Sequence, residues 1–367
     1  MVIEQIPATR AEMTERRALN GGKKSVWNCI KWDFFVEYAV GGALILHDFC
    51  RNGVFMIWLI GSTGMLGSEI AQRLEKNGIP FVGTGSEVDI TDFDALMKFS
   101  ESHSIKPSGI TSASRLSWIV NCAAYTAVDK AEDEKEKAEA INSAGARNIA
   151  RVARQTSAKL IHISTDYVFD GTANTPYTED SPICPIGVYG TSKAEGEKAV
   201  QKEMTQYYIL RTSWLYGFSG KNFVYTMTNA MNNRSEVKVV NDQRGTPTNC
   251  ATLAGIVLQI IASAENAHKL FGHHAALPYG IYNVSDEGET TWFDFAAEIY
   301  RLGKKYKRIS NECAVTPCTT AEYPTKAVRP AYSVLSKAKI ARELGGKIPN
   351  WKESLEHFIK DARFSPC

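Results

Sequence analysis

The chain has 367 residues, with 42 Lys and Arg against 40 Asp and Glu, so its formal net charge at pH 7 is +2. Because this charge is small and the basic residues are scattered, it gives no electrostatic reason to expect binding to nucleic acid or to a membrane surface. The length allows a large buried core and more than one domain.

The cysteines and the apolar segments narrow the class of protein further. The eight cysteines do not form a paired framework, and Cys313 and Cys318 have no second pair nearby with which to complete a zinc site. Free thiols are typical of a reducing compartment. The longest early apolar region, 34–46, is interrupted by Glu37 and two glycines. We therefore expect a cytoplasmic protein and assign no metal ligands.

Residues 1–55 precede the first strand that the sequence predicts. They contain no small-residue cleavage site after a basic segment, so a signal peptide is not indicated. We expect them to form a non-essential N-terminal extension.

A glycine-rich turn follows the first predicted strand. The apolar run 56–60 is typical of a buried parallel strand, and it leads into Gly61-Ser62-Thr63-Gly64-Met65-Leu66-Gly67. A helical pattern over 68–77 comes next and ends before Gly78. Strand, glycine turn and helix start together predict a site for the pyrophosphate of a dinucleotide. A tight strand–helix turn without a ligand is the alternative.

Four more apolar segments alternate with helical ones. They cover 80–83, 118–124, 159–163 and 207–210, with a loop at 87–90 after the first of them. This alternation predicts an α/β fold with a Rossmann-type, doubly wound parallel sheet, which binds ligands at the carboxyl ends of its strands. Such ends are expected at Gly61, Ala124, Thr165 and Trp214.

After about residue 215 the alternation becomes looser. A short strand is predicted at 237–240 and an apolar helix at 252–262. We expect a dinucleotide-binding domain over 56–218 and a smaller, mixed substrate-binding region over 219–367, with part of 237–262 returning to the Rossmann sheet.

Tyr189 and Lys193 are four residues apart in a helical segment, so their side chains share one face. A free Tyr has a pKa of about 10, and a nearby cation favours the phenolate. The pair therefore predicts a proton donor activated by Lys193. On its own, the same spacing is also common on ordinary amphipathic helices.

Together these residues resemble the extended short-chain dehydrogenase/reductases, and within them the dTDP-4-dehydrorhamnose reductase family. The resemblance covers 56 to about 358. Its motifs are the glycine turn, Ala127-Val128-Asp129-Lys130-Ala131-Glu132, Ser164-Thr165-Asp166-Tyr167-Val168-Phe169, Tyr189-Gly190-Thr191-Ser192-Lys193, Arg211-Thr212-Ser213-Trp214 and Asp242-Gln243-Arg244-Gly245-Thr246-Pro247-Thr248.

The resemblance assigns roles to single residues. Tyr189 is the proton donor, Lys193 its activator and a ribose ligand, and Thr165 the hydroxyl that binds the substrate carbonyl. Asp166 and Trp214 match substrate contacts, although a strand cap, a turn and a core aromatic remain alternatives for Thr165, Asp166 and Trp214. The implied cofactor contacts are Gly61, Gly64, Met65, Leu66, Gly67, Asp89, Ile90, Ala124, Tyr125, Thr126, Tyr189 and Lys193.

The implied activity is reduction of the 4-keto group of dTDP-4-dehydro-6-deoxy-L-mannose to dTDP-L-rhamnose, in nucleotide-sugar and cell-surface polysaccharide biosynthesis. NADPH and NADH both remain open as cofactor, because the segment before Asp89 shows neither a clear acidic ribose ligand nor an Arg for a 2′-phosphate. Some members of the family bind Mg²⁺ through glutamates at a homodimer interface, and no matching glutamates are assigned here.

Two other functions remain as alternatives. One is a non-catalytic regulatory subunit of the methionine adenosyltransferase type, which shares the fold. The other is a reductase or epimerase of another nucleotide sugar. Tyr189, Lys193 and Thr165 favour an enzyme over the regulatory subunit.

Overall fold

The computed structural model describes residues 55–103, 115–265 and 277–366. The chain divides into two compact units, Met1–Tyr38 and Ala39–Cys367, and the described residues all belong to the second. The expected N-terminal extension falls outside the described residues except for Phe55. No helix of the described part is both long enough and apolar enough to span a membrane.

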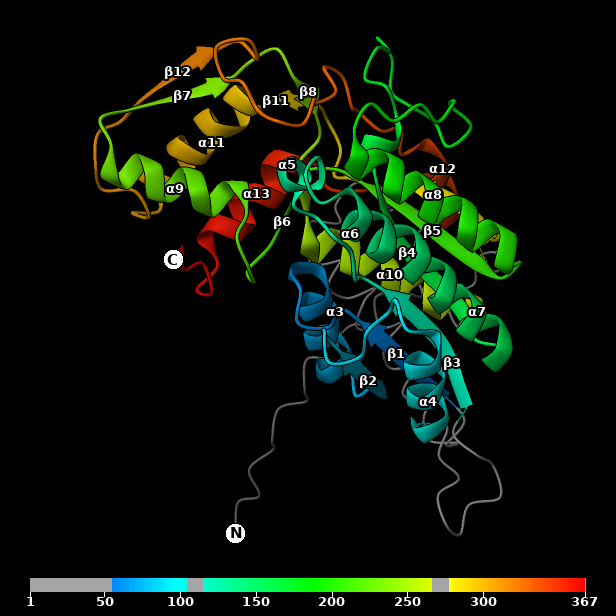
Figure 1. The fold of residues 1–367 in the computed structure, drawn as a ribbon. Coiled ribbons are helices and arrows are strands. Elements are labelled where there is room, and N and C mark those ends of the chain that lie inside the picture. Colours follow the sequence, from blue (N-terminus) through cyan, green and yellow to red (C-terminus); the bar gives the residue numbers. More distant parts are fainter. Residues whose placement is uncertain (1–54, 104–114, 266–276, 367) are drawn as a thin grey trace, which may run out of the picture. The chain divides into compact units, whose positions relative to one another are not determined.

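A six-stranded parallel sheet forms the centre of this unit, which confirms the predicted fold class. The order of its strands is β10 (Gly280–Asn283), β5 (Tyr207–Thr212), β4 (Lys159–Thr165), β3 (Arg115–Asn121), β1 (Phe55–Ile60) and β2 (Phe81–Thr84). Figure 1 labels β1 to β5. Since β2 and β3 flank β1 on opposite sides, the chain reverses direction across the sheet at β1. A crevice for a ligand is expected there, at the carboxyl ends of β1 and β3.

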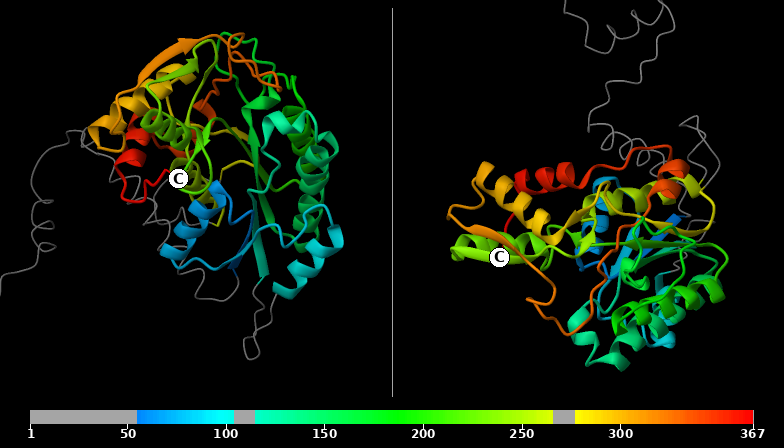
Figure 2. Two further views of the ribbon diagram at one scale, coloured as in Figure 1. Left: turned by 60° about the vertical axis from the view of Figure 1, so that its left-hand side comes forward. Right: turned by 90° about the horizontal axis from the view of Figure 1, so that it is seen from above.

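Both faces of the sheet are covered by helices, as the left panel of Figure 2 shows. Ile57 and Leu59 point into a core with α3 (Met65–Lys76) and α10 (Cys250–Ala264). Their neighbours Trp58 and Ile60 point to the other side, where α4 (Phe93–His103), α7 (Ala146–Thr156) and α8 (Val188–Glu203) pack. This alternation explains why the strand is apolar at every position.

Short helical segments connect the strands at the carboxyl edge. They are α5 (Val128–Ala131), α6 (Lys135–Glu139), a π-helix over Ala140–Gly145 that runs into α7, and a 3₁₀ turn over Asp166–Val168 directly after β4. A π-helical turn inside a helix often marks a functional position.

The C-terminal part forms a smaller mixed region. Strand β7 (Glu236–Val240) pairs with β12 (Ala314–Cys318), and Figure 1 shows them beside α9 (Phe223–Asn233) and α11 (Trp292–Lys305). The remaining elements are β6 (Leu215–Tyr216) paired with β9 (Thr248–Asn249), β8 (Arg244–Gly245) paired with β11 (Thr290–Thr291), α12 (Ala338–Leu344) and α13 (Trp351–Lys360).

The segment 237–262 divides between the two regions. Its strand β7 belongs to the small sheet, while α10 packs on α3 against the face of the Rossmann sheet. The strand that joins the large sheet from this half of the chain is β10. The sequence did not indicate β10, because this strand has only four residues.

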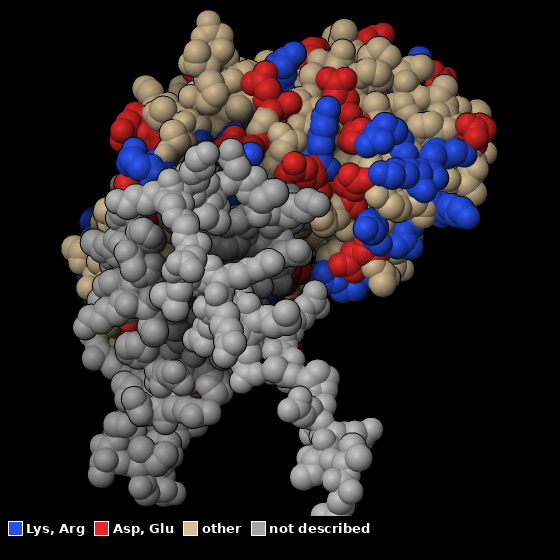
Figure 3. All heavy atoms as spheres, turned by 180° about the vertical axis from the view of Figure 1, so that it is seen from behind, with Lys and Arg blue, Asp and Glu red and all other residues tan. Residues whose placement is uncertain are grey.

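Charged side chains are mixed over the described surface. Figure 3 shows Lys and Arg next to Asp and Glu on the face opposite to that of Figure 1. Ion pairs such as Arg301–Glu298 and Lys305–Glu356 join opposite charges within and between α11 and α13.

Candidate active site

The glycine turn after β1 is closed against the neighbouring strands. The N–H of Gly61 donates to Thr84 O (2.7 Å), and Gly61 has a φ of +78°. A Cβ on Gly61 would lie 2.8 Å from Ala123 N, and one on Gly67 would lie 2.0 Å from Gly61 O. Both positions therefore require glycine, and the turn lies at the crevice between β1 and β3.

The start of α3 offers unpaired donors at this turn. Gly64 is the N-cap and has no side chain to satisfy them, and the first helical residues are Met65, Leu66 and Gly67. The N–H groups of the first turn of a helix have no partner within the helix. The first turn of α3 also carries no acidic residue. A pyrophosphate fits this cradle, because backbone N–H groups and the helix dipole both favour an anion there.

The loop after β3 carries Ala124, Tyr125 and Thr126 past the turn. The main chain of Tyr125 is fixed by Asn142, which accepts from Tyr125 N (2.8 Å) and donates to Tyr125 O (3.1 Å). The Tyr125 phenol donates to Glu134 Oε2 (3.2 Å). The side chain of Tyr125 is thus engaged with α6, which leaves the main chain of the loop as the proposed cofactor contact.

Asp89 and Ile90, the other proposed nucleotide contacts, both have partners within the protein. The Ile90 side chain is buried in the core with α4 and α7. Asp89 Oδ1 accepts from the N–H and from the hydroxyl of Thr91, both at 2.8 Å. The adenine contact of this loop therefore remains a proposal.

The proposed catalytic groups meet where β4 ends against α8. Tyr189 lies near Thr165, whose hydroxyl acts to lower the pKa of the phenol. Thr165 Oγ1 donates to Asp166 Oδ1 (3.0 Å). Since Thr165 is the last residue of β4, these three side chains lie at the carboxyl edge of the sheet.

Lys193 is buried one turn after Tyr189 and contacts the main chain of β4. Its Nζ donates to Ile163 O (2.6 Å), and burial lowers the pKa of its ammonium to about 8. Burial also raises the pKa of Tyr189 to about 12, with the Thr165 hydroxyl opposing the rise. Lys193 was expected to lower the pKa of the Tyr189 phenol. Within the protein alone it does not do so, because its ammonium is held on a carbonyl of β4.

Asp166 is buried beside these residues. Burial raises the pKa of its carboxyl to about 6, while the side chains of Ser333 and then Thr165 act against that rise. Its Oδ2 has no hydrogen-bond partner among the residues that the structure describes. A buried carboxylate oxygen without a partner is costly, so this atom is a candidate acceptor for a hydroxyl of a bound ligand.

Trp214 lies further along the same edge, after β5, in an unusual backbone conformation. Its φ is +46°, which is rare for a bulky residue and found mainly where the surroundings enforce it. Its ring stacks on Trp292 with centroids 3.5 Å apart and planes 10° apart. A Cβ on Gly245 would lie 2.5 Å from the ring, so Gly245 makes room for it.

Three residues of this region were missed by the sequence reasoning. Asn142 lies in the π-helix and joins Tyr125 to Ser192 Oγ (3.0 Å) on α8. Glu197 is buried on the face of Tyr189 and Lys193, and its spacing of four residues from Lys193 was a usable signal. Trp292 could not be found from the sequence, because it is distant along the chain.

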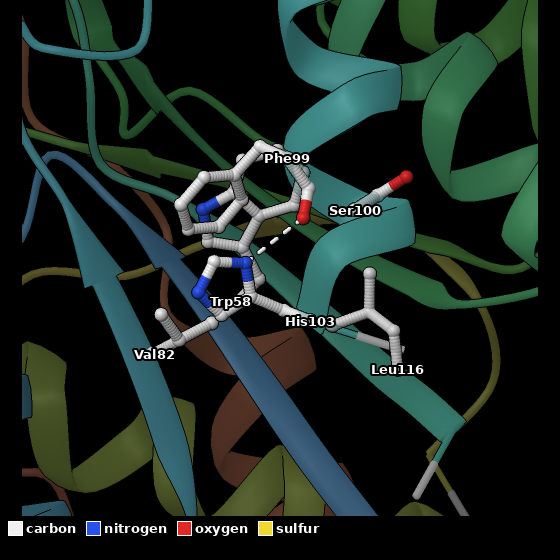
Figure 4. A pocket seen from close by; sticks show the side chains of 6 residues that line it. All are labelled: Trp58, Val82, Phe99, Ser100, His103 and Leu116. Atoms are coloured by element: carbon white, nitrogen blue, oxygen red, sulfur yellow. Dashed lines mark hydrogen bonds between the residues drawn. The ribbon is translucent and has the colours of Figure 1, made fainter. Parts of the chain in front are cut away.

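Another hollow in the structure does not contribute to this site. It is lined by Trp58, Val82, Phe99, Ser100, His103 and Leu116 (Figure 4). The rings of Phe99 stack on Trp58 and on His103, with centroids 4.7 and 4.0 Å apart, so aromatic packing occupies it. Within 55–103, 115–265 and 277–366, no group of three or more His, Cys, Asp or Glu side chains is arranged to hold a metal ion.

Comparison with known proteins gives consistent matches. Residues 55–364 match the model of the RmlD substrate binding domain. The chain is 38% identical over 305 residues to a dTDP-4-dehydrorhamnose reductase of Aggregatibacter actinomycetemcomitans, covering 82% of this chain and 96% of that protein. It is 36% identical over 311 residues to the spore coat polysaccharide biosynthesis protein SpsK of Bacillus subtilis, covering 85% and 99%.

Solved structures agree with these relatives. A dTDP-4-dehydrorhamnose reductase of Clostridium acetobutylicum superposes with a TM-score of 0.72 at 39% identity, covering 83% of this chain and 98% of that one. A second such enzyme, from Bacillus anthracis and in complex with NADP, has a TM-score of 0.69 at 36% identity, with the same coverage of both chains.

The Rossmann-type sheet with its glycine turn, together with the similarity to dTDP-4-dehydrorhamnose reductases of which one was solved with NADP, defines the class of protein, an NAD(P)-dependent reductase. Within that class, the chain belongs to the RmlD family. The family resemblance that the sequence motifs indicated is thereby confirmed.

Proposed function

We propose that this protein uses NADH or NADPH to reduce the 4-keto group of dTDP-4-dehydro-6-deoxy-L-mannose, giving dTDP-L-rhamnose. Two relatives with 38% and 36% identity over nearly their whole length are named dTDP-4-dehydrorhamnose reductases. In this proposal, residues 56–218 bind the dinucleotide and carry the sugar contacts Thr165, Asp166 and Trp214, and residues 219–367 form the smaller substrate-binding region.

The observation that carries the proposal is the grouping of Tyr189, Thr165 and Asp166 at the edge of the sheet, where Thr165 Oγ1 donates to Asp166 Oδ1. A bound nicotinamide supplies the hydride that is added to C4 of the sugar. The Tyr189 hydroxyl gives its proton to the oxygen that becomes the new hydroxyl, and the Thr165 hydroxyl holds that oxygen in place. Hydride and proton together account for both hydrogens of the reduction.

The neighbouring residues position the reactants. The ammonium of Lys193 donates to Ile163 O, and in this position it also binds a ribose hydroxyl of the cofactor near the Tyr189 phenol. Oδ2 of Asp166 accepts a hydroxyl of the sugar, which would satisfy the one oxygen of this carboxyl that lacks a partner. The ring of Trp214, locked by Trp292, gives the nucleotide sugar a flat apolar surface.

The sugar itself must be tested, because relatives with other names are equally similar. A probable dTDP-4,6-dihydroxy-2-methyloxan-3-one 4-ketoreductase of Streptomyces antibioticus is 35% identical over 312 residues. Its identity is close to that of the rhamnose reductases, so the degree of identity does not select the substrate.

The experiment is a panel of dTDP-, UDP- and GDP-linked 4-keto sugars, each offered with NADH or NADPH. Turnover is followed by the loss of nicotinamide absorbance and the product is identified by NMR. We expect the dTDP-4-keto-6-deoxy sugar to give the highest kcat/KM. Faster turnover of a UDP or GDP sugar would reassign the substrate, and no turnover with any sugar would refute the proposal.

A further inference from the structure

The carboxylate of Glu87 is folded back against the end of β2. Its Oε1 accepts a hydrogen bond from Gly85 N (2.7 Å), and the side chain is exposed. A Cβ on Gly85 would lie 2.9 Å from Glu87 Oε2 and 3.2 Å from Thr63 Oγ1. Glu87 and Thr63 therefore both lie close to Gly85 and to each other.

This places Glu87 next to the glycine turn. The last residue of β2, Thr84, accepts through its carbonyl from Gly61 N (2.7 Å) and Ser62 N (2.9 Å), so the strand end and the turn are joined. In dinucleotide-binding folds, the adenosine ribose lies at the end of this second strand. An acidic residue about 20 positions after the glycines binds its 2′-hydroxyl, whereas an Arg accepts a 2′-phosphate.

The segment of the chain that contains Glu87 is acidic. From residue 77 to residue 97 the chain contains no Lys or Arg but four acids, Glu87, Asp89, Asp92 and Asp94. Asp89 is bound to Thr91, and Asp92 caps α4 by accepting from the N–H groups of Asp94 and Ala95 (2.9 and 3.1 Å). Glu87 is thus the acid that faces the turn.

The ionisation state of the Glu87 carboxyl suits a ligand that donates a hydrogen bond from a hydroxyl group. The hydrogen bond from Gly85 N lowers the pKa of its carboxyl, so it is ionised near neutral pH. An ionised carboxylate accepts hydrogen bonds from a ribose diol but repels a phosphate dianion.

We propose that Glu87 selects the cofactor, binding the 2′-hydroxyl of NADH and excluding the 2′-phosphate of NADPH, so that this chain prefers NADH. The inference rests on the proposed function, since it concerns the same nicotinamide site. It also distinguishes this chain from its relative of Bacillus anthracis, which was solved with NADP.

The test measures binding by the full-length protein without sugar, by fluorescence titration with NADH and with NADPH. For the unaltered protein we expect a Kd for NADH at least about tenfold lower than for NADPH. In Glu87→Gln the amide oxygen still accepts from Gly85 N while the charge is lost, so NADPH should bind more tightly and the ratio of the two Kd values should fall about tenfold.

Asp94→Asn is the matched control. It removes one negative charge from the same segment at an exposed side chain in the first turn of α4. We expect it to leave the ratio within about twofold of the unaltered protein, because an exposed charge further from the turn is screened by salt. Unchanged melting temperatures show that both variants are folded.

The outcomes separate the two proposals. Binding of neither dinucleotide overturns the proposed function and this inference with it. Binding of NADPH as tightly as NADH by the unaltered protein overturns the inference alone. A preference for NADH that persists in Glu87→Gln, or that Asp94→Asn removes equally well, shows that Glu87 is not the selecting residue.

Discussion

Glu197 and Arg211 form an ion pair sealed inside the protein beneath the catalytic helix. Arg211 Nη2 lies 2.7 Å from Glu197 Oε2, and the two side chains are 1% and 0% exposed. Glu197 also accepts from Ser164 Oγ (2.5 Å). Because Glu197 follows Lys193 by one helical turn, these contacts tie the catalytic face of α8 to the ends of β4 and β5.

Glu197→Gln should therefore destabilise the fold. The substitution leaves the guanidinium of Arg211 buried without a counter-charge, which costs about 3–5 kcal/mol. The measurement is the free energy of unfolding in urea. Glu195→Gln is the control, since Glu195 pairs with Lys198 on the exposed side of the same helix, and it should cost less than about 0.5 kcal/mol. Equal stability of the two variants would mean that the pair does not hold α8.

Tyr189→Phe should remove catalysis and keep binding. The ring and its contact with Tyr167 (centroids 5.5 Å apart) are retained, and only the hydroxyl is lost. We expect kcat to fall by about 10²-fold or more. Binding of the dinucleotide, measured by titration, should be unchanged. Tyr323→Phe, at an exposed tyrosine, should have normal kcat; if the two variants turn over equally, Tyr189 is not the proton donor.

The parallel sheet and the glycine turn could be predicted because they depend on local patterns, whereas a site that joins Tyr189 and Thr165 was implied by the family resemblance. Strand alternation and glycine spacing are visible in a short window of sequence, and parallel strands bring their ends to one edge. The carboxyl end of β4 therefore had to lie near a helix that follows it.

The rest depends on contacts between distant residues or on burial. The stack of Trp214 on Trp292 joins positions 78 residues apart, and no periodicity of the sequence indicates this contact. Glu87 lies in a short loop whose turn was not recognised, so its carboxylate was not assigned to the ribose. The raised pKa of Tyr189 follows from its burial, which a sequence does not give.

Lys193 should limit activity at alkaline pH. Burial lowers the pKa of its ammonium to about 8, so the group is charged below this pH and neutral above it. If the charged form is required, kcat/KM for the nicotinamide cofactor, which reports on the free enzyme, should fall as pH rises through about 8. The measurement is a profile from about pH 6 to about pH 10. A flat profile across this range would exclude a role for the charge of Lys193.

Asp286 is not one of the proposed catalytic residues, and it should make the stability of the fold depend on pH. It follows β10, its Oδ2 accepts from Asn249 N (3.3 Å), and burial raises its pKa from 3.8 to about 7. The folded state therefore binds the proton more tightly than the unfolded state does. Its contribution to stability is complete below about pH 4 and is lost as pH rises to about 7, by up to about 4 kcal/mol.

Asp286→Asn should remove this loss. Relative to the unaltered protein, the variant should gain unfolding free energy between pH 4.5 and pH 8, by roughly the amount that linkage gives. Urea unfolding of both proteins at several pH values measures the difference. Asp180→Asn, at an exposed carboxyl, should show no such trend. A difference between Asp286→Asn and the unaltered protein that does not change with pH would contradict the raised pKa.

Trp292 should act on substrate binding through Trp214. The stack holds Trp214 at a φ of +46°, a conformation that costs of the order of 1–3 kcal/mol and relaxes when its support is removed. Trp292→Ala should therefore raise KM for the nucleotide sugar about tenfold, equivalent to about 1.4 kcal/mol, with a smaller effect on kcat. Dinucleotide binding should be unchanged, since no residue of the glycine turn is altered.

Trp292→Phe is the conservative partner of this variant, because a phenyl ring can still stack on the indole of Trp214. It should restore most of the affinity for the sugar nucleotide. Steady-state kinetics with saturating dinucleotide give kcat and KM for both variants, and calorimetry gives the Kd of the dinucleotide. Equal losses of kcat and of dinucleotide affinity in Trp292→Ala would point to general unfolding of α11 instead of a displaced Trp214, because only the latter leaves the dinucleotide site intact.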